Sequence, residues 1–389
     1  MFGNSLQECI EKDKSRLYKS LENIERFNGF PQENSSVKKT TQDFLFTYFG
    51  GKPQLTNLHI EITSKCNERC VHCYIPHENK YNHIEPGLFY NILEQCRDLK
   101  LLHLTLSGGE PMLHMNFCDF LKRCNEYNFS VNVLSNLTLL NDEIVNEFKN
   151  NPLLGVQVSL YSMNPLIHDG ITKSKGSFKK TKSAIIKLIE SDIPVQISCP
   201  ILKQNVNSYE EVIQWAKDNN IQVGDDYNII ARYDHSTQNL NSRLSLSEIR
   251  EVTYRKILSN PKYLDNMRGE VKKRRKRKVN DFVCSVGHSS LCIAENGNVY
   301  PCAGWQSYVL GNINEDSLNH IWTNSEKLIS LRGLRNLDFP KCIKCPSKDY
   351  CTMCLVRNSN ESLVGNPLEV NEYFCEVANL NREIMLEIK

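Results

Sequence analysis

The sequence predicts an α/β protein built on a parallel β-sheet, followed by a smaller cysteine-rich region. Between residues 55 and 235, short apolar segments typical of strands alternate with segments that have the apolar period of a helix. Repeated strand–helix units form parallel sheets, because each helix returns the chain to the start of the next strand. Polar or glycine-rich motifs follow several of these strands, at the sheet edge where such folds bind ligands.

Six strands and four helices are expected in this part of the chain. The strands are predicted at residues 55–63, 101–107, 129–135, 156–161, 194–201 and 226–232. The helices are predicted at residues 88–99, 116–127, 178–189 and 209–217. In the first of these helices, Phe89, Ile92, Leu93 and Leu99 recur at helical spacing and define one apolar face.

The flanking regions complete a four-part organisation. Residues 1–30 have a helical apolar pattern, and the polar residues 31–41 indicate a linker. This first helix is a packing arm or an element that helps to recognise a substrate peptide, and Cys9 within it is expected to be a packed thiol. The predicted parts are an N-terminal extension at 1–54, a parallel sheet, open or closed, at 55–235, a helical basic bridge at 236–283 and a cysteine-rich domain at 284–389.

Composition narrows the function classes. The chain has 389 residues, 40% of them hydrophobic, and a net charge of +2, so nothing indicates a polyelectrolyte role. No apolar run approaches the roughly 18 residues of a membrane span, and the first residues lack a secretion signal. Sixteen cysteines in such a chain favour metal binding over disulfides and predict a reducing, cytoplasmic location.

A cysteine triplet follows the first predicted strand. Cys66, Cys70 and Cys73 have the spacing C-x3-C-x2-C, and no fourth cysteine lies nearby. Three thiolates at this spacing can hold three irons of a [4Fe–4S] cluster and leave the fourth iron open. A zinc knuckle or three buried thiols is the alternative. Four other cysteines lack ligand spacing and are expected to be core thiols: Cys96, Cys118, Cys124 and Cys199.

The triplet resembles the signature of the radical S-adenosylmethionine (SAM) enzymes, with His72 in the place of the family's aromatic residue or histidine. The resemblance implies a partial (β/α)6 barrel with SAM bound to the open iron. It also implies reductive cleavage of SAM to methionine and a 5′-deoxyadenosyl radical, which abstracts hydrogen from a substrate. The cofactor supplies this chemistry, and the protein supplies the positioning.

Three further strand ends resemble the family's SAM-binding positions. The sequence Ser-Gly-Gly-Glu-Pro at 107–111 resembles the motif for the SAM amino group, because glycines admit a ligand and a carboxylate binds an ammonium group. The alternative for the other two ends is an ordinary polar strand end. The residues expected to contact SAM are His72, Gly108, Gly109, Glu110, Pro111, Ser135, Asn136 and Ser159.

A run of seven basic residues occupies positions 272–278, after a helix predicted at 245–258. Like charges repel one another, so the run must stay solvated. It is either an exposed helix or linker face, or a patch for an acidic partner such as a leader peptide or an electron-donor protein. No aromatic residues are interleaved with the charges, so nucleic acid is not an expected partner.

The last third of the chain holds a second group of cysteines, which taken alone would suggest a zinc ribbon. The spacing Cys284-x12-Gly297-x4-Cys302, followed by C-x2-C-x5-C, resembles the SPASM domain, which holds auxiliary [4Fe–4S] clusters. The resemblance implies a first auxiliary set and a second auxiliary set. The first comprises Cys284, Cys292, Cys302 and Cys354. The second comprises Cys342, Cys345, Cys351 and Cys375.

Three [4Fe–4S] clusters are therefore expected, one from the triplet and two auxiliary. Cys354 follows Cys351 one residue sooner than in the family pattern, and Cys292 is only a candidate fourth ligand. If neither residue binds, the first auxiliary cluster has an open position for substrate.

The combined resemblance implies a peptide maturase that acts on a ribosomally made precursor peptide and forms a thioether or carbon–carbon crosslink. A reduced flavodoxin or ferredoxin is the expected electron donor. Sulfatase-type or other side-chain oxidation is the alternative, weakened because Ala303 stands where the sulfatase-maturing members have Asp. A non-catalytic Fe–S electron carrier or scaffold is the alternative of another class, and the intact triplet and Gly-Gly-Glu-Pro motif argue against it. The general base is not identified.

Overall fold

The computed structural model describes residues 53–79 and 82–388. The expected N-terminal helix, the linker after it and Cys9 lie outside the described residues. Within them, no helix combines the length and the apolar character needed to cross a membrane.

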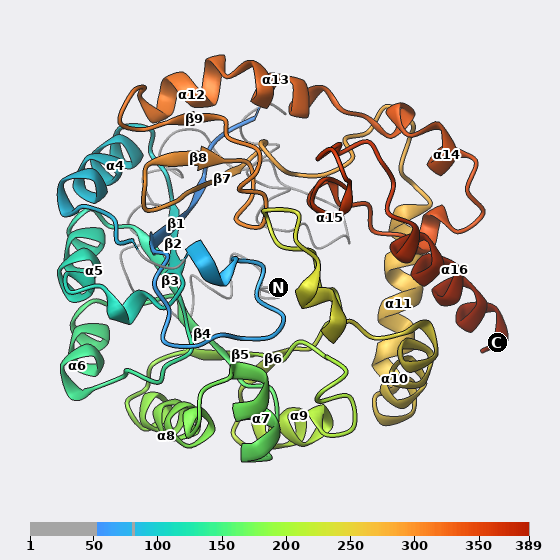
Figure 1. The fold of residues 1–389 in the computed structure, drawn as a ribbon, viewed down its shortest axis with the longest axis horizontal. Helices are drawn as coiled ribbons and strands as arrows, with labels where there is room; N and C mark the ends of the chain where they lie inside the picture. Colours follow the sequence, from blue (N-terminus) through green and yellow to red (C-terminus); the bar gives the residue numbers. More distant parts are fainter. Residues whose placement is uncertain (1–52, 80–81, 389) are drawn as a thin grey trace, which may run out of the picture.

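The described chain is organised around one sheet whose first six strands are parallel, in the spatial order β6-β5-β4-β3-β2-β1 (Figure 1). The strands are β1 Asn57–Thr63, β2 His103–Gly108, β3 Ser130–Ser135, β4 Gly155–Ser159, β5 Val195–Ser198 and β6 Gln222–Gly224. The helices between them are α4 Pro86–Asp98, α5 Phe117–Glu126, α6 Asp142–Asn150, α7 Pro165–Thr172, α8 Ser177–Glu190 and α9 Tyr209–Asp218. The expected α/β fold with a partial parallel barrel is confirmed.

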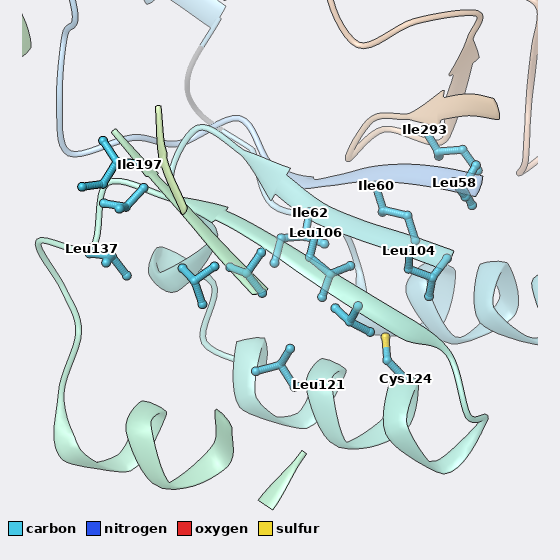
Figure 2. Packing of buried hydrophobic residues seen from close by; sticks show 14 of the residues in the cluster. Leu58, Ile60, Ile62, Leu104, Leu106, Leu121, Cys124, Leu137, Ile197 and Ile293 are labelled. Atoms are coloured by element: carbon cyan, nitrogen blue, oxygen red, sulfur yellow. The ribbon is translucent and has the colours of Figure 1, made fainter. Parts of the chain in front are cut away.

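The two faces of the sheet differ in chemistry. Alternate residues of β1, Leu58, Ile60 and Ile62, point toward the helices and are buried in the hydrophobic core. Figure 2 shows these side chains with those of β2 and with Leu121 and Cys124 of α5. The opposite face carries polar side chains, among them His59, Glu61, Ser107, Asn132, Gln157 and Ser159. Glu61 and Ser107 on this face are buried and the other four are partly buried, so the polar face lies away from the hydrophobic core without being fully exposed.

The sixth strand was predicted at the wrong place. Residues 226–232 form no strand, and β6 is the three-residue segment just before them. The carbonyls of residues 229–231 are instead satisfied by side chains: Arg243 and Asn239 donate to Ile229 and Ile230, and Asn360 donates to Ala231. Ile229 and Ala231 are buried here without a sheet, because these side chains replace the hydrogen bonds of a strand ladder.

Two helices that the sequence analysis did not predict, α6 and α7, have eight or nine residues each. Both begin at an asparagine whose side chain accepts a hydrogen bond from the backbone of the first turn, Asn141 for α6 and Asn164 for α7. Helices this short give a weak periodic pattern of apolar residues, whereas the asparagine caps that start them can be recognised in the sequence.

The C-terminal part continues the same sheet. Strand β7 (Ser290–Ile293) pairs in parallel with β1, and the short strands β8 (Asn298–Tyr300) and β9 (Gly311–Asn312) follow antiparallel. The expected helix at 245–258 is α10 (Leu246–Ser259), and α11 (Pro261–Arg274) follows it. The remaining helices are α12 Leu318–Asn324, α13 Glu326–Gly333, α14 Pro340–Ile343, α15 Leu355–Glu361 and α16 Glu372–Glu387.

Candidate functional site

The triplet lies in a loop that leaves the carboxyl end of β1 and is held at both sides by backbone hydrogen bonds. The amides of Arg69 and Val71 donate to the carbonyls of Thr172 and Ile171 at the end of α7, at 2.9 and 3.0 Å. The Cys73 amide donates to the Cys70 carbonyl at 3.2 Å, which closes a turn between the second and third cysteines. The loop that carries the three cysteines is therefore fixed by tertiary contacts.

The thiols of this loop have polar neighbours. The amide of Glu68 lies 3.4 Å from the Cys66 Sγ, and the Glu68 carboxylate lies 3.5 Å from the Cys70 Sγ. The hydroxyl of Tyr161, just past β4, lies 4.0 Å from the Cys70 Sγ, and its ring packs edge-on against His72 with centroids 5.1 Å apart. The Glu68 amide suits a thiolate at Cys66 that binds iron, because such thiolates accept hydrogen bonds from backbone amides.

The two glycines after β2 allow the next loop to pack directly on the backbone that leads to Cys66. A Cβ on Gly108 would lie 2.0 Å from the Thr63 carbonyl oxygen, and one on Gly109 would lie 2.1 Å from that of Lys65. Gly108 also has a φ of +130°, a conformation that favours glycine. The amides of Gly109 and Glu110 donate to these two carbonyls at 2.7 Å. The motif thus positions the triplet loop.

Glu110 joins the ends of β2 and β3. Its carboxylate is fully buried and accepts hydrogen bonds from the Ser135 hydroxyl at 2.8 Å and from the amides of Asn136 and Met112 at 2.7 and 3.1 Å. Burial raises the pKa of Glu110 to about 7, and these three donors act in the opposite direction. Three of the expected SAM-binding residues, Glu110, Ser135 and Asn136, are therefore brought into direct contact.

The other expected SAM-binding residues lie along the same edge of the sheet. Ser159 ends β4 and pairs with Ser198 of β5, and Pro111 opens a short 3-10 helix after Glu110. The carbonyl of His72 accepts a hydrogen bond from Asn239 at 3.3 Å. The carboxyl ends of β2, β3 and β4 thus carry the predicted positions along one edge of the sheet, and the side-chain amide of Asn136 donates to the Asn67 side chain of the triplet loop at 3.0 Å.

Three members of the first auxiliary set lie together. Burial raises the pKa of Cys284, and the neighbouring Cys354 thiolate adds to this rise. The surrounding protein raises the pKa of Cys302 to about 11, with contributions from the Cys354 and Cys284 thiolates. Trp305 explains part of this proximity, because its buried indole donates to the Ser359 hydroxyl at 2.8 Å and so ties the loop after Cys302 to α15 after Cys354.

Cys292 is placed differently from its three expected partners. It lies on β7 opposite Tyr300, is 1% exposed, and faces the polar side of the sheet beside His59 of β1. Burial raises the pKa of its thiol, and Glu61, Cys302 and Glu295 add to the rise. Cys292 is therefore near Cys302 but is held by the sheet ladder rather than by the loops that carry the other three.

The second auxiliary set surrounds a common space. A cavity of about 160 Å³ is lined by its four cysteines and by Cys354, and we call it the cysteine cavity. Burial raises the pKa of Cys342 to about 11, and the Cys351, Cys375 and Cys345 thiolates raise it further. Burial also raises the pKa of Cys351, whereas Arg357 and Arg274 lower it. A cavity bounded by this donor set fits the group that the sequence predicts there.

A second cavity, of about 360 Å³, opens between the triplet loop and the loop after Cys302. We call it the acidic cavity, because three carboxylates line it, those of Glu61, Glu78 and Glu295. The polar groups that complete its lining include Ser64, Asn82, Tyr233, Asn296, Tyr300 and Gln306. Its walls therefore come from the segments next to two of the three cysteine groups.

Glu61 is the residue that connects these two loops. Its carboxylate accepts a hydrogen bond from the Tyr74 hydroxyl at 2.9 Å and one from the Gln306 side-chain amide at 2.6 Å. Tyr74 directly follows Cys73, and Gln306 lies four residues after Cys302. Burial raises the pKa of Glu61 to about 7, against the effect of these two donors. The sequence analysis missed Glu61, although a carboxylate within a buried strand was a readable signal.

The four cysteines expected to be core thiols are packed in the hydrophobic core. Cys96, Cys124 and Cys199 are completely buried, and Cys118 is partly buried against the same core. Burial raises the pKa of Cys199 to about 12, so this thiol stays protonated.

Two family models match the chain. Residues 60–216 match the Radical SAM superfamily, and residues 284–354 match SPASM, an iron-sulfur cluster-binding domain. The two matches include the triplet and the Gly-Gly-Glu-Pro motif, and every C-terminal cysteine in question except Cys375.

Similar proteins span most of the chain. The antilisterial bacteriocin subtilosin biosynthesis protein AlbA of Bacillus subtilis is 26% identical, over 80% of this chain and 69% of its own length. The AdoMet-dependent heme synthase of Methanosarcina barkeri is 25% identical, over 80% of this chain and 94% of its own length. Streptococcus suis SuiB, in a crystal structure bound to the precursor peptide SuiA, has the same fold, with a TM-score of 0.66 and 14% identity over 92% of this chain and 87% of SuiB.

Proposed function

We propose that this chain, which belongs to the radical SAM superfamily and carries a C-terminal SPASM domain, matures a ribosomally made precursor peptide. It is an enzyme that binds SAM and a [4Fe–4S] cluster in its first domain and auxiliary iron–sulfur clusters in its second. Its product is an oxidative crosslink, a thioether or a carbon–carbon bond, and its electron donor is a reduced flavodoxin or ferredoxin.

The observation that carries the proposal is the acidic cavity between the triplet loop and the loop after Cys302. A peptide side chain in this space lies between the two regions that would hold a radical-generating cluster and an auxiliary cluster. Similarity to AlbA, a bacteriocin biosynthesis protein, supports a peptide as the substrate. The precursor peptide bound to SuiB supports a peptide-binding use of the shared fold.

We assign the ligand sets as the sequence predicts them. Cys66, Cys70 and Cys73 hold the first cluster, and the second auxiliary set holds the cluster of the cysteine cavity. Cys284, Cys302 and Cys354 hold the other auxiliary cluster, with Cys292 the candidate fourth ligand. For the two auxiliary sets, the support is the mutual influence of their cysteines on one another's pKa and the partly enclosed cavity lined by the second set. Three clusters in total follow from these assignments.

The SAM-binding residues in this proposal are His72, the 108–111 loop, Ser135, Asn136 and Ser159. Their support is their common edge at the carboxyl ends of β1 to β4. Glu110 has a second role, since its carboxylate holds the ends of β2 and β3 in register whether or not SAM is bound. When bound, SAM and the first cluster supply a 5′-deoxyadenosyl radical, which removes a hydrogen atom from the substrate. An auxiliary cluster supplies an acceptor for one electron.

An oxidative crosslink also releases one proton, and we assign Glu61 as its acceptor. The carboxylate lines the acidic cavity, and the Tyr74 hydroxyl and Gln306 amide fix its orientation. Burial brings the pKa of Glu61 to about 7, near the value at which a carboxylate both holds and accepts protons at neutral pH. Glu295, which lines the same cavity, adds to this rise through its negative charge.

A second candidate is modification of a small cofactor, because the AdoMet-dependent heme synthase is about as similar to this chain as AlbA is. The 360 Å³ of the acidic cavity would suit part of such a molecule as well as a peptide side chain.

The test uses the full chain, reconstituted with iron and sulfide without oxygen, with SAM, a reductant and the peptide encoded beside its gene. We expect the peptide to lose about 2 Da, the mass of the two hydrogens that a new bond removes. Cys70→Ala is the control that should leave the mass unchanged. An unchanged mass with deuterium taken up from solvent would indicate epimerisation, and turnover of a tetrapyrrole but of no peptide would favour the second candidate.

A further inference from the structure

The basic run at 272–278 is divided between solvent and the cysteine cavity. Its first three residues fill the last turn of α11, where positive charge interacts favourably with the helix dipole. Four members of the run line the cysteine cavity: Arg274, Arg275, Arg277 and Lys278. The remaining three, Lys272, Lys273 and Lys276, do not line it. Arg274 is the half-buried member of the run and the other six residues are exposed, so the run is largely the solvated face that the sequence suggested, with Arg274 as the exception.

The cavity-facing part of the run is held in place by contacts on both sides. The side chain of Arg274 is 20% exposed and pairs with the Glu270 carboxylate at 3.6 Å. The side chain of Arg275 is 62% exposed, and its Nε lies 3.4 Å from the Asp349 carboxylate, two residues before Cys351. The Leu337 amide donates to the Val279 carbonyl at 2.9 Å, which ties the end of the run to the segment before Cys342. These positive charges thus keep a defined place relative to the second auxiliary set.

The lining of the cavity carries more positive than negative charge. Lys348 and Arg357 also line it, so six cations are in the lining, whereas Asp349 is the acidic residue there. Arg274 and Arg357 are the partly buried cations, and the other four are exposed. An iron–sulfur cluster held by four thiolates is an anion, and it gains a further negative charge on reduction. A fixed positive charge in a partly enclosed site stabilises the more negative form more strongly, because solvent screens it less there.

We propose that Arg274, with Arg275 and Arg277 beside it, raises the reduction potential of the auxiliary cluster in the cysteine cavity and so makes that cluster an electron acceptor. The basic run is then a positioning element for the redox centre. This inference rests on the proposed function only through the ligand assignment of the second auxiliary set, and it does not depend on which peptide or cofactor the enzyme modifies.

The test is a redox titration followed by electron paramagnetic resonance, on the full chain with the triplet replaced by alanine so that the auxiliary clusters alone contribute. Arg274→Gln should shift the cavity cluster to a more negative potential, and Arg274→Lys should restore most of the wild-type value. Lys272→Gln and Lys276→Gln remove the same charge from the solvent side of the same run. These controls should leave the potential close to that of the parent protein.

An opposite change guards against a general loss of structure. Asp349→Asn removes the anion that pairs with Arg275 and should shift the potential in the positive direction. Equal shifts in Arg274→Gln and Lys272→Gln, or a negative shift in Asp349→Asn, would overturn the inference. A parent protein that binds no iron at the second auxiliary set would overturn it together with the ligand assignment. No substrate is added, so a failed peptide assay would leave this result unaffected.

Discussion

The two cavities of the molecule have opposite electrostatic character. Three carboxylates line the acidic cavity, and neither lysine nor arginine is among the described residues that line it. Six cations and one carboxylate line the cysteine cavity. In the first, burial and a neighbouring negative charge raise the pKa of Glu61, which favours taking up a proton. In the second, cations favour added negative charge. This difference supports the proposed separation of proton transfer, at Glu61, from electron storage, at the auxiliary cluster of the cysteine cavity.

The largest expected effect is the difference between replacing a cysteine of the triplet and replacing a cysteine of the cysteine cavity. Cys70→Ala should abolish the formation of 5′-deoxyadenosine, because the triplet then lacks a ligand for the cluster that reduces SAM. Cys351→Ala, in the cysteine cavity, should still form 5′-deoxyadenosine but lose the crosslinked product. Chromatography of the nucleoside and mass spectrometry of the peptide measure both. Equal yields of 5′-deoxyadenosine from Cys70→Ala and the unmodified protein would contradict the assignment of SAM cleavage to the triplet.

The next effect concerns the acidic cavity. Glu61→Gln should lower the rate of product formation by about 10²- to 10⁴-fold, the usual contribution of a general base, while 5′-deoxyadenosine still forms. In the parent enzyme the rate should rise with pH through about 7, because the deprotonated carboxylate is the acceptor. Glu61→Gln should lose this rise.

Tyr74→Phe provides the matched control for that pH profile. It removes the hydroxyl that donates to the Glu61 carboxylate, so the Glu61 pKa and the midpoint of the profile should move upward. Rate measurements between pH 6 and about 8.5 cover both midpoints, since Glu61 itself titrates near 7. A profile identical in all three proteins would exclude Glu61 as the proton acceptor.

The packing of the segment after β6 against α15 should depend on a buried ion pair. Arg243, between β6 and α10, pairs with Glu361 at the end of α15 at 2.5 Å, with side chains 8% and 11% exposed. Arg243→Met should reduce the free energy of unfolding by about 3–5 kcal/mol, because it leaves a buried carboxylate unpaired. Chemical denaturation measures this. The exposed pair of Arg250 with Glu383 is the control, where Arg250→Met should cost no more than about 1 kcal/mol.

A smaller and more local effect should follow from Gly109→Ala. The added Cβ meets backbone atoms within 2.1 Å, so the loop that carries Glu110 must shift away from the triplet loop. We expect a loss of about 1–3 kcal/mol in stability and weaker SAM binding, measured by thermal unfolding and calorimetry. Gly87→Ala is the matched control on α4, where a Cβ meets nothing within 4 Å and stability should not fall. An unchanged affinity for SAM in Gly109→Ala would separate this loop from the binding site.

Much of the fold and of the candidate site could be predicted from local sequence patterns. The spacing of the triplet predicted one loop that carries three cysteines, because residues a few positions apart in a turn cannot move far apart. The Gly-Gly-Glu-Pro motif was readable for the same reason. The grouping of the C-terminal cysteines came from the resemblance to the SPASM domain, since each set includes residues that are tens of positions apart. The weakest local signals failed: β6 is three residues long, and residues 226–232 are apolar enough to resemble a strand while their carbonyls bind side chains from elsewhere.

Only the tertiary structure decided the contacts between distant parts of the chain. Glu61 and Gln306 are 245 positions apart, and β7 joins the sheet beside β1 after more than two hundred residues. Arg274 faces the cysteine cavity while Lys272 faces solvent, a difference set by how α11 packs against the segment before Cys351. By itself, the sequence determined the cysteine spacings, the strand–helix alternation and the glycines of the loop. Those depend on neighbours along the chain, whereas the charge of each cavity depends on which surfaces the core brings together.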